Sequence, residues 1–377
     1  MTRELTSNAL FSAFEIRSLR LPNRIVMSPM TRSYSPEGVP GTDVADYYRR
    51  RAEGGTGLVI TEGVAIDHPA AVDNPRVPRM HGGQALAGWR HVTDTVHRAG
   101  GRIIPQLWHV GPLWGAMVDA DPAVSMRPSG LWGTPGHTVY PDRYIERASA
   151  PVRAMTEQDI TEVIAAYVRS ARNAVDAGFD GIAIHGGHGY LLDAFLWEST
   201  NRRDDDWGGD LVRRTRFPVE VVRAIRAEIG PDLPIFYRFS QHKQQDYGAR
   251  IAETPDELGV VLGALVEAGV DVLDASIRRF DTPAFDGSDL SLAGWAKKLT
   301  GAASMAVGSV GLTKSLRDSG VPEPADLSGL LRRVDEEEFD LVAIGRLHLA
   351  DPAIAETIRT GGALPTYERK KYESRLY

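Results

Sequence analysis

The feature that most constrains the fold of this chain is a series of eight short apolar runs, each followed by a longer segment with helical spacing of apolar residues. This alternation is typical of parallel strands joined by crossover helices. The runs lie at 24–29, 57–64, 102–109, 179–185, 234–240, 270–276, 304–309 and 340–346. Eight parallel strands are the number that closes a (β/α)₈ barrel. We therefore predict an α/β fold in which one TIM barrel forms a single domain over residues 1–377.

The segments between the runs predict the helices of this barrel. In 157–177 the apolar residues Ile160, Val163 and Tyr167 recur three and four positions apart, which places them on one stripe facing the barrel. Thr156 can cap this helix because an acid follows three residues later, and Gly178 can end it. The other predicted helices lie near 43–53, 84–99, 211–229, 255–268, 290–299, 324–337 and 352–360.

Two segments do not fit the repeat. Residues 8–22 carry an apolar run before the first strand and are expected to form a hairpin that caps the N-terminal mouth of the barrel. Residues 110–151 are rich in Pro, Gly and Trp and show no helical period, which predicts a long excursion after the third strand. Long structured loops in compact domains are usually functional.

Composition excludes several functions. Lys and Arg number 43 against 50 Asp and Glu, so no nucleic-acid partner is expected. The chain has no cysteine, which excludes disulfides, thiolate nucleophiles, cysteine-bound zinc and iron–sulfur clusters, so an electron carrier must be organic or haem. The first residues lack the apolar core of a secretory signal, and no stretch approaches the ~20 apolar residues of a membrane span. We expect a cytoplasmic enzyme with a small-molecule substrate and no membrane partner.

In such a barrel the reactive groups lie where the strands end. The fourth run ends with two histidines and a tyrosine, His185, His188 and Tyr190. The fifth ends with Arg238, a cation that needs an anionic partner if it is buried. The last two runs end in glycines, a serine and an arginine, a combination that favours phosphate, as do strands seven and eight of barrels generally. These residues are Gly308, Ser309, Gly311, Gly345 and Arg346.

Together these motifs resemble the Old Yellow Enzyme family of FMN-dependent ene-reductases over nearly the whole chain. The segments that carry the resemblance are NRIVMSPMTR (23–32), ITEG (60–63), QLW (106–108), HGGHGYLLDAFLWESTNRRDDDWGG (185–209), the Arg238 run and the two glycine-rich loops. The resemblance implies that the flavin is contacted by Pro29, Met30, Thr31, Gly63, Gln106, His185 and Arg238. It also implies that the FMN phosphate is bound by Gly308, Ser309, Gly311, Gly345 and Arg346.

The same resemblance implies roles in catalysis. His185 and His188 would donate hydrogen bonds to a substrate carbonyl, Tyr190 would protonate the α-carbon, and Trp108 would form a wall of the pocket. NADH or NADPH would be the reductant. The adjacent arginines near 278 are not a general family feature, and Arg279 is expected to shape the substrate pocket. A homo-oligomer is compatible with this interpretation.

Several alternatives stay open from the residues alone. An H-x-x-H with Asp193 nearby could hold a metal in a barrel hydrolase, although the first strand lacks the paired histidines of such enzymes, and we predict no metal. Arg238 could pair with a strand-end acid such as Glu62. An FMN-dependent dehydrogenase or demethylase and a non-catalytic FMN-binding relative are the remaining alternatives.

Overall fold

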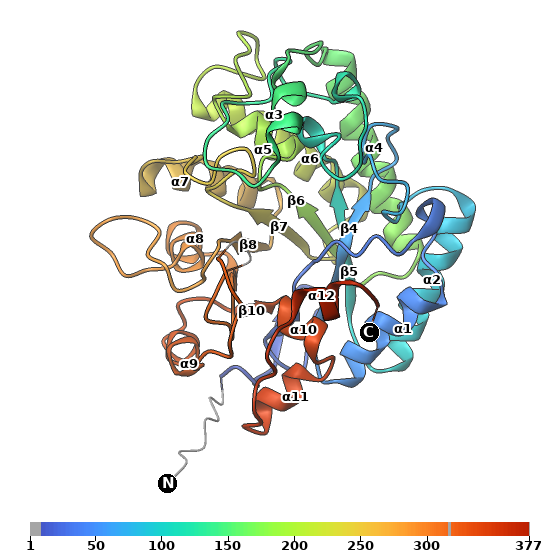
Figure 1. The fold of residues 1–377 in the computed structure, drawn as a ribbon, viewed down its shortest axis with the longest axis vertical. Coiled ribbons are helices and arrows are strands. Elements are labelled where there is room, and N and C mark those ends of the chain that lie inside the picture. Colours follow the sequence, from blue (N-terminus) through green and yellow to red (C-terminus); the bar gives the residue numbers. More distant parts are fainter. Residues whose placement is uncertain (1–8, 316–317, 377) are drawn as a thin grey trace.

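The eight predicted runs form eight parallel strands that close a barrel (Figure 1). The computed structural model describes residues 9–315 and 318–376. The barrel strands are β3 (Ile25–Met27), β4 (Leu58–Ala65), β5 (Ile103–Trp108), β6 (Ile182–His185), β7 (Ile235–Phe239), β8 (Val272–Ser276), β9 (Ala303–Val307) and β10 (Leu341–Ile344), and β10 pairs with β3. The predicted TIM barrel is confirmed. The single-domain organisation over residues 1–377 stays a prediction.

Helices follow the strands and surround the barrel (Figure 1). The helices of the repeat are α1 (Thr42–Glu53), α2 (Gly83–Arg98), α4 (Glu157–Asp176), α6 (Leu211–Ile229), α7 (Pro255–Ala268), α8 (Leu292–Thr300), α9 (Ser328–Asp335) and α11 (Ile354–Arg359). The additional helices are α3 (Asp142–Ser149), α5 (Leu191–Leu196), α10 (Arg346–Ala350) and α12 (Arg369–Glu373). The predicted cap of α4 is confirmed, because the Thr156 side chain and Asp159 form a reciprocal capping box.

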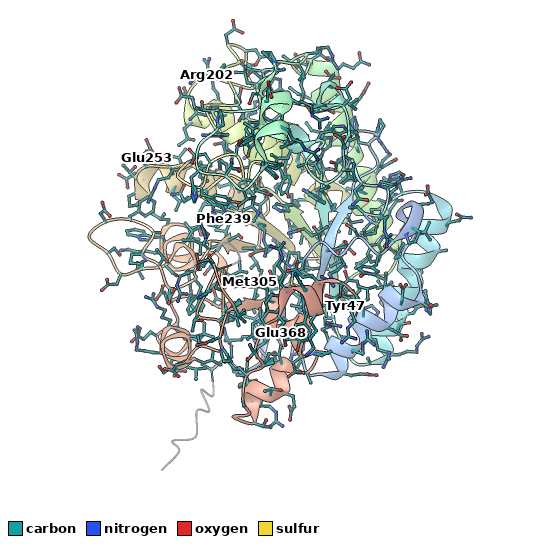
Figure 2. The ribbon with its side chains drawn as sticks, viewed as in Figure 1. Tyr47, Arg202, Phe239, Glu253, Met305 and Glu368 are labelled. Atoms are coloured by element: carbon teal, nitrogen blue, oxygen red, sulfur yellow. The ribbon has the colours of Figure 1, made fainter. Side chains whose placement is uncertain are left out.

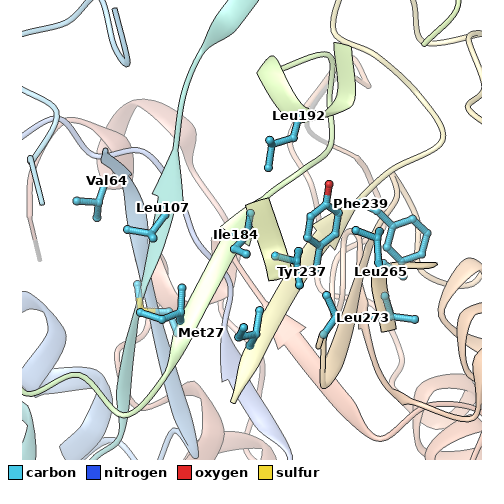
Figure 3. Close-up of a cluster of buried hydrophobic side chains, with 14 of the residues drawn as sticks. Met27, Val64, Leu107, Ile184, Leu192, Tyr237, Phe239, Leu265 and Leu273 are labelled. Atoms are coloured by element: carbon cyan, nitrogen blue, oxygen red, sulfur yellow. The ribbon is translucent and has the colours of Figure 1, made fainter. Parts of the chain in front are cut away.

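The barrel strands are buried on both faces, and successive side chains alternate between them. Val26, Phe236 and Met305 belong to a cluster inside the barrel, and Met305 lies near the centre of the side chains in Figure 2. Residues of the opposite set, such as Leu107 and Ile184, pack outward in the cluster that also contains the helices (Figure 3). Each such side chain contributes roughly 1.5–3 kcal/mol by burial, so the two layers together fix the strands that carry the site.

The segment expected to cap the barrel contains an antiparallel hairpin of β1 (Phe14–Ile16) and β2 (Leu19–Leu21). Its apolar side chains Phe14, Leu19 and Leu21 pack in the same cluster as the interior strand residues. The Ser18 N–H donates to the Asp232 carbonyl, just before β7 begins, which places the hairpin at the N-terminal ends of the strands. Residue 8, the first of this predicted segment, lies outside the described residues.

The structure differs from the predicted elements at three places, of which one is a predicted helix boundary. The 110–151 excursion contains helix α3, which begins after Pro141. Its 8 residues bury only Tyr144 and Ala148, which are too few to show a helical period in the sequence. The helix predicted at 324–337 begins only at Ser328, because Pro324 forms an isolated bridge with Leu312. A further short helix, α10, begins directly at Arg346, where the eighth run was expected to end.

Candidate active site

Polar side chains from neighbouring strands lie side by side at one rim of the barrel. Gly63 on β4 is the register partner of Gln106 on β5, and His185 on β6 is the partner of Arg238 on β7. Arg238 is in turn the partner of Asp274 on β8. Because parallel strands end at the same rim, their register brings these five residues together. All of them except Asp274 were predicted to belong to the site.

Two histidines, a tyrosine and a tryptophan form an aromatic cluster above this rim. The ring centroids of His185 and His188 are 5.2 Å apart, and those of His185 and Tyr190 are 4.7 Å apart. Trp108 meets the Tyr190 ring edge-on at 4.9 Å. The Nε2 atom of His188 lies 2.9 Å from the hydroxyl of Ser276, which belongs to β8. The structure thus brings together the four residues expected to contact substrate at the end of β6 and its neighbour β5.

The loop that carries His188 and Tyr190 is held in an unusual backbone conformation. His188 has a φ of 64°, in the left-handed region that costs a non-glycine residue about 1–2 kcal/mol. Its N–H donates to the Ser240 hydroxyl at 2.8 Å, and the Gly189 N–H donates to Asp193 at 2.6 Å. Asp193 is also paired with Lys243 at 2.6 Å, and both side chains are fully buried. These bonds fix the loop against the segment that follows β7.

Burial disfavours the charged form of both histidines. Burial lowers the pKa of His185 and His188 well below the usual value, and the positive charge of Arg238 lowers both further. The Gly187 N–H makes a long bond of 3.5 Å to Nδ1 of His185. Since a neutral imidazole has one donor and one acceptor, this bond favours the tautomer with the proton on Nε2, where it can be donated to a ligand.

Arg238 is buried with an anionic partner, as the sequence required, but the partner is not Glu62. Its Nε donates to Asp274 at 2.7 Å, with side-chain exposures of 6% and 3%, and its Nη2 donates to the Ser28 hydroxyl at 3.2 Å. Burial raises the pKa of Asp274, and the nearby Arg238 charge opposes that rise. The alternative of an ion pair between Arg238 and a strand-end acid is therefore seen, with Asp274 in place of Glu62.

Glu62 instead holds the chain that follows β3. One carboxylate oxygen accepts the N–H groups of Arg32 at 2.8 Å and Ser33 at 2.9 Å. Burial raises the pKa of Glu62 to about 7. The bonds anchor the end of the predicted flavin-contacting segment Pro29–Thr31, and Thr31 lines a cavity of about 200 Å³ together with Trp108 and Tyr190.

The ends of β4 and β5 hold a buried hydrogen-bond donor that a ligand could satisfy. The Nε2 of Gln106 is buried without a hydrogen-bond partner, although buried amides are nearly always bonded. Gly63 lies beside it, and a Cβ atom there would come within 2.5 Å of the Trp108 ring. Glycine at this position is therefore explained by the packing of Trp108, whereas Gln106 has an unsatisfied donor that a ligand acceptor would fill.

The ends of β9 and β10 surround a small cavity of about 130 Å³. Its lining includes Met30, Gly308, Ser309, Gly345 and Arg346, all predicted to contact the cofactor. Gly308 has a φ of 150°, and a Cβ there would collide with the backbone carbonyl of Ile277. Nη2 of Arg346 donates to the Ser309 hydroxyl at 2.9 Å, which places a guanidinium beside the glycine loop.

Gly311 completes that loop from further along the chain. It has a φ of 71°, and an added Cβ would approach a methyl group of Leu347 within 2.5 Å. Glycine adopts this left-handed conformation without a steric cost, whereas a side chain here would collide with Leu347.

A second cavity of about 290 Å³ shares Gly308, Ser309 and Arg346 with the first. It adds the guanidinium of Arg278 and reaches His188. No described carboxylate lines either cavity. Two cations with hydroxyl groups and close backbone suit an anionic group such as phosphate. Arg278 also pairs with Asp318 at 3.3 Å, so its charge is partly compensated.

Arg279 lies outside both of these cavities. Its guanidinium donates to the Thr313 carbonyl at 2.9 Å and to Asp281 at 3.0 Å. It lines a neighbouring cavity of about 410 Å³, to which Arg278 also contributes. Contact between Arg279 and substrate stays a prediction. Of the two arginines, Arg278 is the one that lines the cavity of about 290 Å³.

Three residues at the site were missed in the sequence. Asp274 interrupts the apolar run at 270–276, and a carboxylate inside a buried strand is a signal that could have identified the partner of Arg238. His242 and Gln244 follow β7 in the segment RFSQHKQQ and line the cavity of about 290 Å³. Their position after a strand end carries a signal, but their direction depends on how the loop folds back.

The metal alternative requires a cluster of ligand side chains. No group of three His, Cys, Asp or Glu among the described residues could hold a metal ion. Asp193, the acid named for this alternative, is engaged by Lys243 and the Gly189 N–H. In the described part of the chain, no helix is both long and apolar enough to cross a membrane.

The rim fits a flat, phosphorylated cofactor. Gln106 offers an unsatisfied donor and Arg238 a buried cation at the centre, while Arg278 and Arg346 offer charge at the edge of the connected cavities. A flavin mononucleotide has hydrogen-bond acceptors on its ring and a dianion at the end of its side chain, so the donor set matches both parts of the molecule.

Comparison with known proteins points in the same direction. The sequence model of the NADH:flavin oxidoreductase / NADH oxidase family matches residues 9–364. The chain is 32% identical to 12-oxophytodienoate reductase 7 of Oryza sativa subsp. japonica, over 96% of this chain and 91% of that protein. It is 33% identical to an NADH oxidase of Thermoanaerobacter brockii over 93% of this chain, and spans about half of that longer protein, 51%. The fold matches the solved structure of morphinone reductase with a TM-score of 0.78 and 29% identity, covering 100% of this chain and 94% of that one.

Proposed function

Because this chain belongs to the NADH:flavin oxidoreductase / NADH oxidase family and is an FMN-dependent NAD(P)H oxidoreductase, we propose that it reduces the activated C=C bond of α,β-unsaturated carbonyl compounds. The observation that carries the proposal is the cluster of His185, His188, Tyr190 and Trp108 beside a buried cation. Neutral hydrogen-bond donors and a phenol together suit a reaction that develops negative charge on a carbonyl oxygen and then needs a proton at carbon.

The residues that would hold FMN follow from the rim. Gln106 and Arg238 would contact the ring, with the Pro29–Thr31 segment and Gly63 beside them. Gly308, Ser309, Gly311, Gly345 and Arg346 would contact the phosphate. When bound, FMN supplies a carrier that takes a hydride from NADH or NADPH and delivers it to an activated alkene.

His185 and His188 would bind the carbonyl oxygen of the substrate. Because burial keeps both imidazoles neutral, each donates one N–H without bringing a full charge into the pocket. Donors directed at this oxygen stabilise the enolate-like charge that develops as the β-carbon accepts hydride. Removing one such donor typically costs roughly 10²–10³ in kcat, so the pair accounts for a large part of the rate.

Tyr190 would supply the proton to the α-carbon. Its ring lies against both His185 and Trp108, which places the phenol next to the carbonyl-binding histidines. Trp108 excludes water on that side and would limit the orientation of a bound alkene. The reductant would use the same pocket in turn, and the existence of a morphinone reductase structure in complex with tetrahydroNAD supports a nicotinamide at such a rim.

The histidine pair and Tyr190 have defined roles in the reduction of an activated alkene. They have no such defined role in an FMN-dependent dehydrogenase or demethylase, or in a non-catalytic FMN-binding protein. The site residues, the cytoplasmic location and the assembly into a homo-oligomer stay predictions.

The proposed function is tested with the purified protein. It should be yellow, should lose its flavin absorbance when NADH or NADPH is added without oxygen, and should regain it when cyclohexenone is added. Absorbance that bleaches but does not return with cyclohexenone, maleimide or a nitroalkene would contradict the proposed substrate class. Protein that takes up no FMN would contradict the assignment of the rim.

A further inference from the structure

A chain of hydrogen-bonded side chains links the 110–151 excursion to Tyr190. Tyr140, which belongs to the excursion, donates its hydroxyl to the Gln244 Oε1 at 2.7 Å. The Gln244 Nε2 donates to the Tyr190 hydroxyl oxygen, also at 2.7 Å. The long insertion after β5 lines the cavity beside Tyr190 with Leu113 and Met117, and it reaches the Tyr190 hydroxyl through Gln244, which follows β7.

Gln244 is held firmly from both sides. Its N–H donates to the His188 carbonyl at 3.1 Å, and its own carbonyl accepts the Thr138 hydroxyl at 2.6 Å. Tyr140 in turn packs edge-on against Tyr144 of α3, with ring centroids 5.0 Å apart. The amide of Gln244 thus has a fixed position between the excursion and the histidine loop.

Gln244 also lies between the two halves of the site. It lines the cavity of about 200 Å³ that contains Thr31 and Tyr190, and it lines the cavity of about 290 Å³ that contains His188. Because its side chain lies at the border of both cavities, Gln244 can bond the Tyr190 hydroxyl without filling either cavity.

The chemistry of the contact suits a proton donor. A phenol oxygen that accepts an amide N–H keeps its own hydrogen for another partner, so the bond sets the direction of donation. The same N–H bonds a phenolate more strongly than a phenol, because a charged acceptor strengthens a hydrogen bond. The bond therefore stabilises the anion that remains after the proton has left.

We infer that Gln244 is the positioning residue for the proton donor, and that Tyr140 orients its amide. The inference rests on the proposed function. The hydride from NADH or NADPH forms the new C–H bond at the β-carbon, and the Tyr190 O–H bond breaks to give the proton to the α-carbon. The hydride brings the electron pair of the β C–H bond, and the C=C π pair moves to the α-carbon, where it forms the bond to the proton. The phenolate then regains a proton from solvent. Gln244 is unchanged throughout.

The first test compares separate half-reactions in the FMN-loaded Gln244→Leu protein. Reoxidation of the flavin by cyclohexenone should slow about tenfold to a hundredfold, the effect of losing a hydrogen bond to a charged group. Flavin reduction by NADPH, and reoxidation by ferricyanide, which needs no proton at carbon, should change less than about twofold. Equal slowing of all three rates would show a general structural effect and overturn the inference.

A second readout does not depend on turnover. Fluorotyrosine NMR, with the Tyr190 resonance assigned by its loss in Tyr190→Phe, gives the pKa of that phenol directly. Loss of the amide donor should raise this pKa by about one unit in Gln244→Leu, and Gln244→Glu should raise it further because a carboxylate repels the phenolate. An unchanged pKa in both variants would overturn the inference.

Controls separate position from chemistry. Gln241→Leu makes the same change three residues earlier in the same loop, where the side chain bonds the Ala252 carbonyl and the Ile251 N–H, and it should not slow the enone step selectively. Tyr140→Phe should slow the enone step in the same direction by a smaller factor. A selective loss in Gln241→Leu equal to that in Gln244→Leu would contradict a specific role.

A double variant distinguishes failure of this inference from failure of the proposed function. If Gln244 acts through Tyr190, Gln244→Leu should add little to the slowing already caused by Tyr190→Phe. Additive effects would overturn the inference. If Tyr190→Phe alone leaves the enone step unchanged, the proposed role of Tyr190 fails, whatever Gln244 does.

Discussion

The buried pair of Lys243 and Asp193 should be among the most sensitive points of the fold. The two charges lie 2.6 Å apart with no exposed side-chain surface, and Asp193 also accepts the Gly189 N–H beside Tyr190. Replacing Lys243 with Met removes one charge and leaves the other buried with a single N–H donor. Breaking a buried pair in this way costs about 3–5 kcal/mol of the free energy of unfolding.

The thermal effect follows from the size of the chain. For 377 residues the entropy of unfolding is about 0.8 kcal/mol/K, so a loss of about 4 kcal/mol lowers the Tm by about 5 °C. Calorimetry and urea denaturation followed by tryptophan fluorescence measure the two quantities. Lys297→Met is the matched control, because Lys297 pairs with Asp340 at 2.9 Å while 30% of its side chain is exposed, and an exposed pair contributes less than about 1 kcal/mol.

The pH dependence gives a second check on the same variant. Burial already raises the pKa of Asp193, and losing the Lys243 charge raises it further above the unfolded value. As pH falls through this raised pKa, the folded state takes up a proton that the unfolded state does not bind, so the deficit of Lys243→Met should shrink on acidification. Adding Asp193→Asn should recover part of the loss at neutral pH. A deficit below about 1 kcal/mol, or one that grows on acidification, would refute the reasoning.

Other changes have defined outcomes. Thr156→Ala removes one half of the capping box with Asp159 and should cost about 1 kcal/mol of stability in urea denaturation, with normal FMN content. Arg346→Gln should weaken FMN binding about tenfold or more in a fluorescence-quenching titration but leave riboflavin binding nearly unchanged, and equal losses for both ligands would exclude a phosphate contact. Burial lowers the pKa values of His185 and His188 below the unfolded value of about 6.5. Their contribution to the free energy of unfolding is therefore present above a pH of about 6.5 and should be lost as the pH falls below it. An NMR titration that shows either imidazole protonated near neutral pH would contradict this.

The barrel could be predicted from the sequence because its signal is repeated eight times. Each strand is buried on both faces and each main helix on one, so periodicity and capping residues such as Thr156 locate them. The exceptions have local causes. Pro324 is drawn into a bridge with Leu312, and α3 is so short that two buried residues cannot make a period.

The site was predictable only in part, for a physical reason. Residues at strand ends, such as His185 and Arg238, are placed by the barrel itself, because the register of parallel strands puts them at one rim. Residues such as Gln244 depend on how a loop folds back, and the contact with Tyr140 joins positions 104 residues apart. Asp274 was detectable as a carboxylate in an apolar run, but its choice of Arg238 rather than another cation depends on the pairing of β7 with β8.

The central claim is that this rim delivers a hydride to one carbon of an activated alkene and a proton to the other. The most direct measurement is the position of deuterium in the product of cyclohexenone reduction. With nicotinamide cofactor carrying deuterium at the transferable position, the label should appear at the β-carbon, and with unlabelled cofactor in deuterated water it should appear at the α-carbon. Reduction of the carbonyl instead of the alkene, or cofactor-derived deuterium at the α-carbon, would contradict the account.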